Sequence, residues 1–407
     1  MNGKKWLIIF VLTSVCFALL IGSFNYIVDP YGFFRTVEIK GFNQQKEGVR
    51  NNIRYIKLIE ISLRKPKTIL MGSSRVHDSI NPESDVLKDI APLQGGVYNY
   101  GIDMARIKEI KFFLEHAIKN SKIERLVLGL DFFMFNKYEK LNITYNKELT
   151  NRKINFMDLY FQPLFSIQSL TKSFSTIKVS NQQQDRREFL VNGYRPGESV
   201  FFGLKDYRKL HNSTNYIFLS KNSIDTLYYA KMDLDDEVFQ DFRDIIKICK
   251  NNNIALTLYI SPAHAELDGE GLTLANQYEN FENWKREITK IAYNNDLSLC
   301  DFSGYNSITT EDVKTPMQYY WDSSHFKEKV GDYILEKILS NSRNNNIPID
   351  FGVKVTPSNI ENHLNNIRTK RVEYLRKNKS ALEITHRKLK DALEGKKIDI
   401  EDTQGIF

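Results

Sequence analysis

The stretch Thr68-Ile-Leu-Met-Gly-Ser-Ser-Arg75 indicates both the class of the fold and the place of its chemistry. Three apolar residues, 69–71, run directly into Gly72, Ser73 and Ser74. An apolar run that stops at a Gly-Ser-Ser turn is typical of a buried strand. Glycine lets the backbone bend where a Cβ would collide. The hydroxyls then follow the carboxyl end of a strand, where open α/β sheets place their chemistry.

The rest of the chain repeats this alternation of apolar strands and amphipathic helices. Further strands are expected at 97–101, 125–131, 254–260 and 297–301, with helices at 45–65, 104–120, 235–251, 273–295 and 327–340. Strands that alternate with helices predict a parallel sheet covered by helices on both faces. We therefore expect one α/β domain over residues 66–340.

Two regions depart from this pattern. Residues from about 135 to 232 are rich in Asn, Lys, Tyr, Gln and Ser, which predicts an insertion with a helix near 164–179. The segment 341–407 is polar, and its part 358–393 has weak helical periodicity. We expect this tail to be a peripheral helix or a partner-binding arm, because it offers too few apolar residues for a second core.

The N-terminus has the sequence of a membrane anchor. Lys4 and Lys5 precede residues 6–28, an apolar run whose strongly polar member is Asn25. About 20 apolar residues span a bilayer as a helix, and lysines on the short side place residues 1–5 in the cytoplasm. A cleaved signal peptide is the alternative, but no small-x-small site ends the run. The expected location is the inner (cytoplasmic) membrane, with residues 29–65 membrane-proximal and the domain periplasmic or extracellular.

Composition narrows the range of partners and cofactors. The 407 residues are 42% hydrophobic and carry a net charge of +7, with basic residues spread along the chain, so no nucleic-acid partner is expected. The cysteines are Cys16, Cys249 and Cys300, and no Cys/His pattern has zinc spacing, so neither a metal nor a cofactor is expected. Cys249 and Cys300 either form a disulfide, as export permits, or remain free thiols.

A second motif supplies the partners that a reactive serine needs. Trp321-Asp-Ser-Ser-His-Phe326 lies just before the last predicted helix of the domain. A serine hydroxyl needs an adjacent base, and a histidine base needs a carboxylate to hold its tautomer. Asp322 and His325 are close enough on one turn to provide that pair. Ser74, Asp322 and His325 therefore form a candidate acyl-transfer triad, with Ser73 as the alternative nucleophile.

Three blocks together resemble the SGNH (GDSL-type) hydrolases: Gly72-Ser-Ser74, Asn99-Tyr-Gly101 and Asp322-Ser-Ser-His325. The resemblance covers roughly residues 66–131 and 235–340. It implies a flavodoxin-like three-layer fold in which Ser74 is the nucleophile and Asp322 and His325 act as acid and base. It also implies an oxyanion hole that contains the backbone N–H groups of Ser74 and Gly101.

The third block of that family usually adds an Asn side chain to the oxyanion hole, and here Asp131 occupies its place. A carboxylate cannot donate a hydrogen bond unless it is protonated, so Asn99 or Asn136 is an alternative donor. Arg75 either binds an anionic substrate group or forms a surface salt bridge. His264 either lines the pocket, rivals His325 as a base or is a loop histidine without a role. The candidate substrate-binding residues are Ser73, Arg75, Asn99, Asp131 and His264.

The anchor extends the resemblance to membrane-anchored SGNH proteins of alginate O-acetylation and teichoic acid D-alanylation. These work beside a multi-spanning acyltransferase of the MBOAT type. The resemblance implies a serine esterase or O-acyltransferase that acts on acyl groups, chiefly acetyl, of a cell-envelope or exopolysaccharide glycan. One alternative is a catalytically weak or inactive partner subunit of a membrane acyltransferase or polysaccharide-export complex. Another is a lipase-like enzyme held near lipid.

Overall fold

A six-stranded, mostly parallel sheet forms the centre of the computed structural model, which describes residues 3–49, 52–90, 96–138, 147–182, 192–201, 203–220, 229–340 and 346–396. The strands are β1 (Thr68–Met71), β2 (Val97–Asn99), β3 (Arg125–Leu130), β4 (Ala255–Ile260), β5 (Leu299–Asp301) and β6 (Val353–Val355). Their order in the sheet is β2-β1-β3-β4-β5-β6. The strands predicted at 68–71, 97–101, 125–131, 254–260 and 297–301 are confirmed as β1 to β5, all parallel, and β6 is antiparallel to β5.

The strand order reverses between β1 and β3, because β2 lies on one side of β1 and all later strands lie on the other. Loops that follow two such strands leave in opposite directions and open a crevice at the carboxyl ends of the strands. The Gly-Ser-Ser turn follows β1, and Asp131 follows β3. Residues 68–75 therefore end at the point where the strand order reverses.

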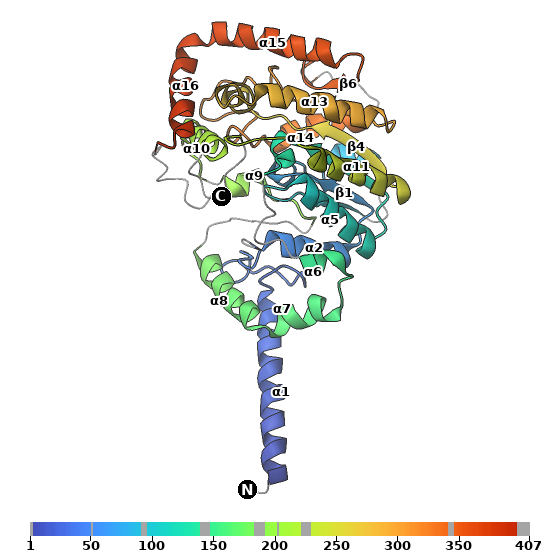
Figure 1. The fold of residues 1–407 in the computed structure, drawn as a ribbon. Coiled ribbons are helices and arrows are strands. Elements are labelled where there is room, and N and C mark those ends of the chain that lie inside the picture. Colours follow the sequence, from blue (N-terminus) through green and yellow to red (C-terminus); the bar gives the residue numbers. More distant parts are fainter. Residues whose placement is uncertain are drawn as a thin grey trace.

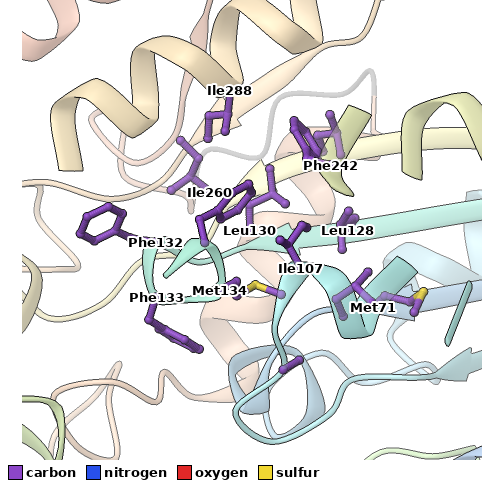
Figure 2. Packing of buried hydrophobic residues seen from close by; sticks show 14 of the residues in the cluster. Met71, Ile107, Leu128, Leu130, Phe132, Phe133, Met134, Phe242, Ile260 and Ile288 are labelled. Carbon is purple, nitrogen blue, oxygen red and sulfur yellow. The ribbon is translucent and has the colours of Figure 1, made fainter. Parts of the chain in front are cut away.

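Helices cover both faces of the sheet, as predicted. Alternate residues of β1 face opposite ways: Ile69 and Met71 belong to one apolar cluster and Leu70 to the other. The first cluster includes residues of α2 (Ile53–Arg64), α5 (Ile107–Asn120), α11 (Asp236–Asn251) and α13 (Tyr278–Tyr293). The second includes residues of α4 (Asp85–Ile90) and α14 (Glu328–Leu339). Figure 2 shows Met71, Leu128 and Leu130 of the sheet with Phe242 and Ile288 of the helices that cover them.

Three predicted helices begin later than expected. The helix predicted at 45–65 begins at Ile53, that at 104–120 begins at Ile107, and that at 273–295 becomes α13 at Tyr278. In the first case, turns around Gly48 pack against the preceding segment, since Gly48 N donates to Pro30 O at 3.0 Å. Leu58 of α2 belongs to the main core, so α2 is part of the α/β domain. The predicted membrane-proximal segment, 29–65, therefore extends into the domain.

The insertion is helical over most of its described length, and its residues 139–146, 183–191, 202 and 221–228 lie outside the described ranges. Its helices are α6 (Lys147–Asn151), η2 (Met157–Phe161), α7 (Gln162–Phe165), α8 (Ile167–Asn181), α9 (Gly197–Val200) and α10 (Tyr207–Leu219). The predicted helix near 164–179 is confirmed as α7 and α8. Short helices η1 (Phe132–Phe135), η3 (Ala265–Gly271) and α12 (Leu272–Leu274) follow β3 and β4.

The tail forms helices that pack on the outside of the domain, in agreement with the expectation of a peripheral helix, and its binding of a partner stays a prediction. It contributes β6, α15 (Ile360–Lys377) and α16 (Lys379–Leu393). The carboxylate of Glu270 is buried and accepts from Arg371 Nε and Nη2, both at 2.9 Å, and from His386 Nε2 at 2.9 Å. Tyr305 OH donates to the same carboxylate at 2.6 Å. One buried charge therefore attaches both tail helices to the segment after β4.

Among the described residues, one helix is long and apolar enough to cross a membrane, namely α1 (Gly3–Val28). Figure 1 shows it projecting alone from the rest of the molecule. Cys16 is exposed on α1. Cys249 and Cys300 are free thiols, so the open question of their pairing is answered in favour of two unpaired cysteines.

We expect Arg371→Leu to loosen α15 and α16 without unfolding the sheet. Arg371 holds one side of the buried Glu270 carboxylate, and removing one partner of a buried ion pair costs about 3 kcal/mol. Hydrogen exchange followed by mass spectrometry should be faster across residues 360–393 and unchanged in β1, β3 and β4.

Lys370→Leu is the matched control, because Lys370 Nζ lies 3.5 Å from Asp350 Oδ2 in a more exposed pair. Such a pair contributes less than about 1 kcal/mol. Equal exchange in the two variants would show that Glu270 is not the attachment point of the tail.

Candidate active site

The three side chains of the predicted triad meet at the carboxyl ends of the strands. Ser74 begins α3 (Ser74–His77) directly after β1, and its Oγ lies 2.9 Å from His325 Nε2. His325 Nδ1 lies 2.8 Å from Asp322 Oδ2. Both distances are within the hydrogen-bond reach that activation of a serine by histidine requires. Residues 251 positions apart in the chain are thus brought into one hydrogen-bonded line.

The turn that presents Ser74 depends on Gly72. Its φ is +155°, and a Cβ there would collide with the side chain of Val76. Ser73 then caps the short helix, since its Oγ accepts from Arg75 N at 3.2 Å. Because the strand passes into a helix over these two residues, Ser74 lies directly after the carboxyl end of β1 and is partly exposed.

Asp322 is buried, and its carboxylate is fully hydrogen-bonded. Oδ1 accepts from Ser324 N and His325 N, both at 2.7 Å, and Oδ2 accepts from His325 Nδ1 and from Thr214 Oγ1 at 2.9 Å. Burial raises the pKa of Asp322, but His325 and these hydrogen bonds outweigh it and lower the pKa below its ordinary value. The group therefore remains a carboxylate although its side chain is buried.

Thr214 is a site residue that the sequence did not reveal. It lies on α10 of the insertion, 108 positions before Asp322. A threonine within a helix has no local signature that would connect it to a distant carboxylate. The insertion thus completes the triad, because one of its helices orients the acid.

The electrostatics of His325 suit a general base. Burial lowers its pKa, but the Asp322 carboxylate beside it has the larger net effect and raises the pKa above the ordinary 6.5. Because Asp322 accepts from Nδ1–H, the neutral ring presents the lone pair of Nε2 to the Ser74 hydroxyl. The arrangement can take the proton of Ser74 as its oxygen attacks an electrophile.

Ser73, Arg75 and Asp131 form a buried network below the triad, not a substrate-binding surface. Asp131 Oδ2 accepts from Ser73 Oγ at 2.6 Å, and Oδ1 accepts from Arg75 Nη1 at 2.9 Å. Arg75 Nε also lies 3.2 Å from Ser324 Oγ. Arg75 is 1% exposed, so it forms neither the surface salt bridge nor the substrate contact considered for it. Asp131 is an acceptor here. Because the Ser73 hydroxyl donates to it, Ser73 is not placed to act as the nucleophile.

Gly101 does not offer the free N–H that the resemblance implies. Its N–H donates to Asn99 Oδ1 at 2.9 Å, which corrects its assignment to the oxyanion hole. An Asn side chain commonly accepts from the backbone two residues on, and this local turn takes the donor. Asn99 Nδ2 donates to Val76 O and Ile80 O, both at 2.8 Å, so Asn99 is structural.

The other predicted amide donor is also engaged, since Asn136 Nδ2 donates to Lys231 O at 3.2 Å. Of the donors named for the oxyanion hole, the Ser74 N–H remains. As the first residue of α3, Ser74 has no intrahelical acceptor for its N–H. This backbone group is therefore in position to face a developing negative charge beside the nucleophile.

His264 is buried behind the triad loop and is neither a rival base nor a pocket residue. Its Nε2 donates to Glu311 O at 2.7 Å, and its Nδ1 accepts from Glu266 N at 3.2 Å. His211 Nε2 lies 3.2 Å from His264 Nδ1 and 3.4 Å from Glu266 Oε2, so these three residues could in principle ligate a metal. Arg208 already neutralises Glu266, at 2.8 Å, and the histidines pair with each other. We assign the cluster to packing between α10 and the segment after β4.

Arg195 braces the helix that carries Ser74 and was not predicted. Its Nε and Nη2 donate to Asp78 at 2.6 and 2.9 Å, and its Nη1 donates to Asp103 at 2.9 Å. His77, Asp78 and Asp103 are close enough to hold a metal, but Arg195 already provides their counter-charge. Burial, Lys57 and Arg195 together lower the pKa of His77 to about 3, so His77 is neutral and structural.

Neither a comparison with the models of known protein families nor one with curated proteins gives a match for this chain. The description of the site therefore depends on its own geometry. That geometry brings together Ser74, His325 and Asp322, and it assigns Ser73, Arg75, Asn99, Asp131 and His264 to the framework around them.

We expect the ring of His325 to titrate above 6.5 in the wild-type protein and at a lower pH in Asp322→Asn. The amide carries no charge, so burial then dominates and favours the neutral ring. Nuclear magnetic resonance of ¹⁵N-histidine-labelled protein across a pH series measures both values.

Ser74→Ala is the control, since it removes a neutral hydrogen-bond partner and leaves the carboxylate in place. The His325 pKa should stay raised in that variant. An unchanged pKa in Asp322→Asn would show that the carboxylate does not govern this ring.

Proposed function

We propose that this protein is a membrane-anchored serine esterase or O-acyltransferase of the SGNH type. The observation that carries the proposal is the hydrogen-bonded line from Ser74 Oγ through His325 to Asp322. The strand order β2-β1-β3-β4-β5 is that of flavodoxin-like sheets, and the nucleophile follows β1 at the reversal point, which supports the fold that the resemblance implies.

In the proposed reaction, Ser74 Oγ attacks the carbonyl carbon of an ester while its proton moves to His325 Nε2. Asp322 stabilises the resulting imidazolium, and the Ser74 N–H donates to the oxyanion. Collapse of the tetrahedral intermediate expels the alkoxide, which takes the proton from His325, and leaves the acyl group on Ser74. A sugar hydroxyl or water then attacks the acyl carbon and gives its proton to His325. Collapse of this second intermediate breaks the bond from the acyl carbon to Ser74 Oγ, which takes the proton back from His325.

The proposed acyl donor and acceptor follow from the anchor. An N-terminal span with lysines on its short side supports a domain outside the cytoplasm, where envelope or exopolysaccharide glycans are found. We propose acyl groups of such a glycan, chiefly acetyl, as the substrate. An MBOAT-type acyltransferase in the same membrane is the proposed source of the acyl group.

One observation favours a second candidate, a catalytically weak or inactive partner subunit of a membrane acyltransferase or export complex. The Gly101 N–H is bonded to Asn99, and Asp131 stands where an amide donor is expected. An oxyanion hole that loses one donor slows acyl transfer by about 10²- to 10³-fold. The same fold would then serve binding instead of turnover.

A fluorophosphonate probe separates the two candidates, because it forms a covalent bond to an activated serine oxygen and loses fluoride. We expect the full-length protein to be labelled on Ser74, identified by peptide mass spectrometry, and Ser74→Ala to lose the label. Ser73→Ala is the control and should still be labelled, since the Ser73 hydroxyl donates to Asp131. Absence of label in well-folded wild-type protein would favour the partner-subunit function.

Thr214→Val should slow labelling by about tenfold, because loss of a hydrogen bond to a charged group costs about 1.5 kcal/mol or more. The substitution keeps the shape of the side chain and removes the donor to Asp322. Ser213→Ala is the neighbouring control, since its hydroxyl bonds to Lys209 O within the same helix. Equal rates in the two variants would mean that Thr214 does not orient the acid.

A further inference from the structure

A group of short helices surrounds the point where α1 enters the globular part of the molecule. We call residues 156–181, which comprise η2, α7 and α8, the collar. Figure 1 shows α7 and α8 beside the inner end of α1. Asn25 of α1 donates from Nδ2 to Leu164 O at 2.7 Å and accepts from Ser173 Oγ at 2.7 Å. The rings of Phe24 and Phe174 lie 5.1 Å apart, so the collar and the helix are packed together.

The collar exposes an unusual number of large apolar side chains. These are Phe156, Met157, Tyr160, Phe161, Phe165, Ile167 and Phe174. Ile167 is 83% exposed and Phe174 is 60% exposed, and their spacing of seven places them on one face of α8. A concentration of exposed apolar groups of this kind marks a surface that is covered in the working protein.

The position of the collar along α1 indicates what covers it. Residues 3–20 of α1 are exposed throughout, and burial begins at Gly22, Asn25 and Val28, where the collar packs. Residues 6–20, between the lysines and the collar, are about 22 Å long at about 1.5 Å per residue. Because the hydrocarbon is about 30 Å thick, it extends to the level where the collar packs on α1, near the boundary with the headgroups.

The charged residues of α8 are also suited to the interface between the hydrocarbon and water. The α8 sequence contains Lys172 and Lys178 and no acidic residue. Helices that lie in a membrane interface combine aromatic and aliphatic residues with lysines, which attract anionic lipid headgroups. Aromatic residues are likewise enriched at the boundary between hydrocarbon and water.

We propose that the collar is a membrane-binding surface, seated in the interfacial layer of the bilayer that α1 crosses. Its occupant is lipid, since the exposed face is continuous with the exposed face of α1. The inference is independent of the chemistry proposed for Ser74. The domain would then be attached to the membrane at two places, through the spanning helix α1 and through the collar. Together they would fix the orientation of the domain relative to the membrane, whereas α1 alone would leave it free to rotate.

Spin labels on the full-length protein in nanodiscs of phosphatidylethanolamine and phosphatidylglycerol test the proposal. In a Cys16→Ser background, a cysteine replaces Ile167 or Phe174 in the collar, Leu12 in α1, or Val372 on α15, at the end of the molecule away from α1 (Figure 1). All four side chains are exposed. Replacing Phe174 removes its ring contact with Phe24, but the hydrogen bonds of Asn25 to Leu164 O and Ser173 Oγ still hold the collar on α1. Collisions with oxygen report contact with lipid, and collisions with a water-soluble nickel chelate report contact with water.

We expect labels at 167 and 174 to resemble the label at 12, with high oxygen collision and loss of nickel collision, while the label at 372 shows the reverse. Labels at 167 and 174 that behave like the one at 372 would overturn the proposal, because the collar would then face water. Exclusion of both reagents would overturn it as well, because protein would then cover the collar. Nickel access at position 12 would show that α1 itself does not span, and the proposal would fail with it.

Discussion

A buried carboxylate is stable only when its neighbours neutralise it and donate hydrogen bonds to it. The neighbours that do this for Asp322 come from separate parts of the chain. Its partners are two backbone N–H groups of its own loop, the ring of His325 and the hydroxyl of Thr214. The loop, the ring of His325 and a helix of the insertion must therefore occupy fixed relative positions. Without that arrangement the charge would be unstable where it stands, and the base beside Ser74 would lose its orientation.

Other buried charged side chains around the site also bond to partners on distant segments of the chain. Asp131 joins the turn after β1 to the end of β3, and Arg195 joins the insertion to the helix that begins at Ser74. Lys57 of α2 donates to Asn99 O and Gly193 O, at 2.7 and 2.8 Å, and so connects a helix before the sheet with the insertion. The insertion is thus part of the scaffold of the site. Its removal would leave several of these charges without partners.

The sequence predicted the strands and the convergence of the triad because both are encoded locally. Apolar runs ending in polar turns mark β1 to β5, and parallel strands bring their carboxyl ends to one edge. It could not predict the loss of the Gly101 donor, since that depends on the rotamer of Asn99, nor the contact of Thr214, which joins distant segments. Three residues, Val353–Val355, are too short a run to identify β6. The burial of Arg75 was not predicted, because nothing in the sequence identifies Asp131 as its buried partner.

The position of β6 has a consequence for biogenesis. It covers the outer edge of β5, and it is made of residues near the end of the chain. Until those residues emerge during synthesis, the outer edge of β5 presents unpaired backbone groups, which can recruit a strand from another molecule. A nascent chain that stalls before residue 353 would therefore keep this edge open and be prone to aggregate.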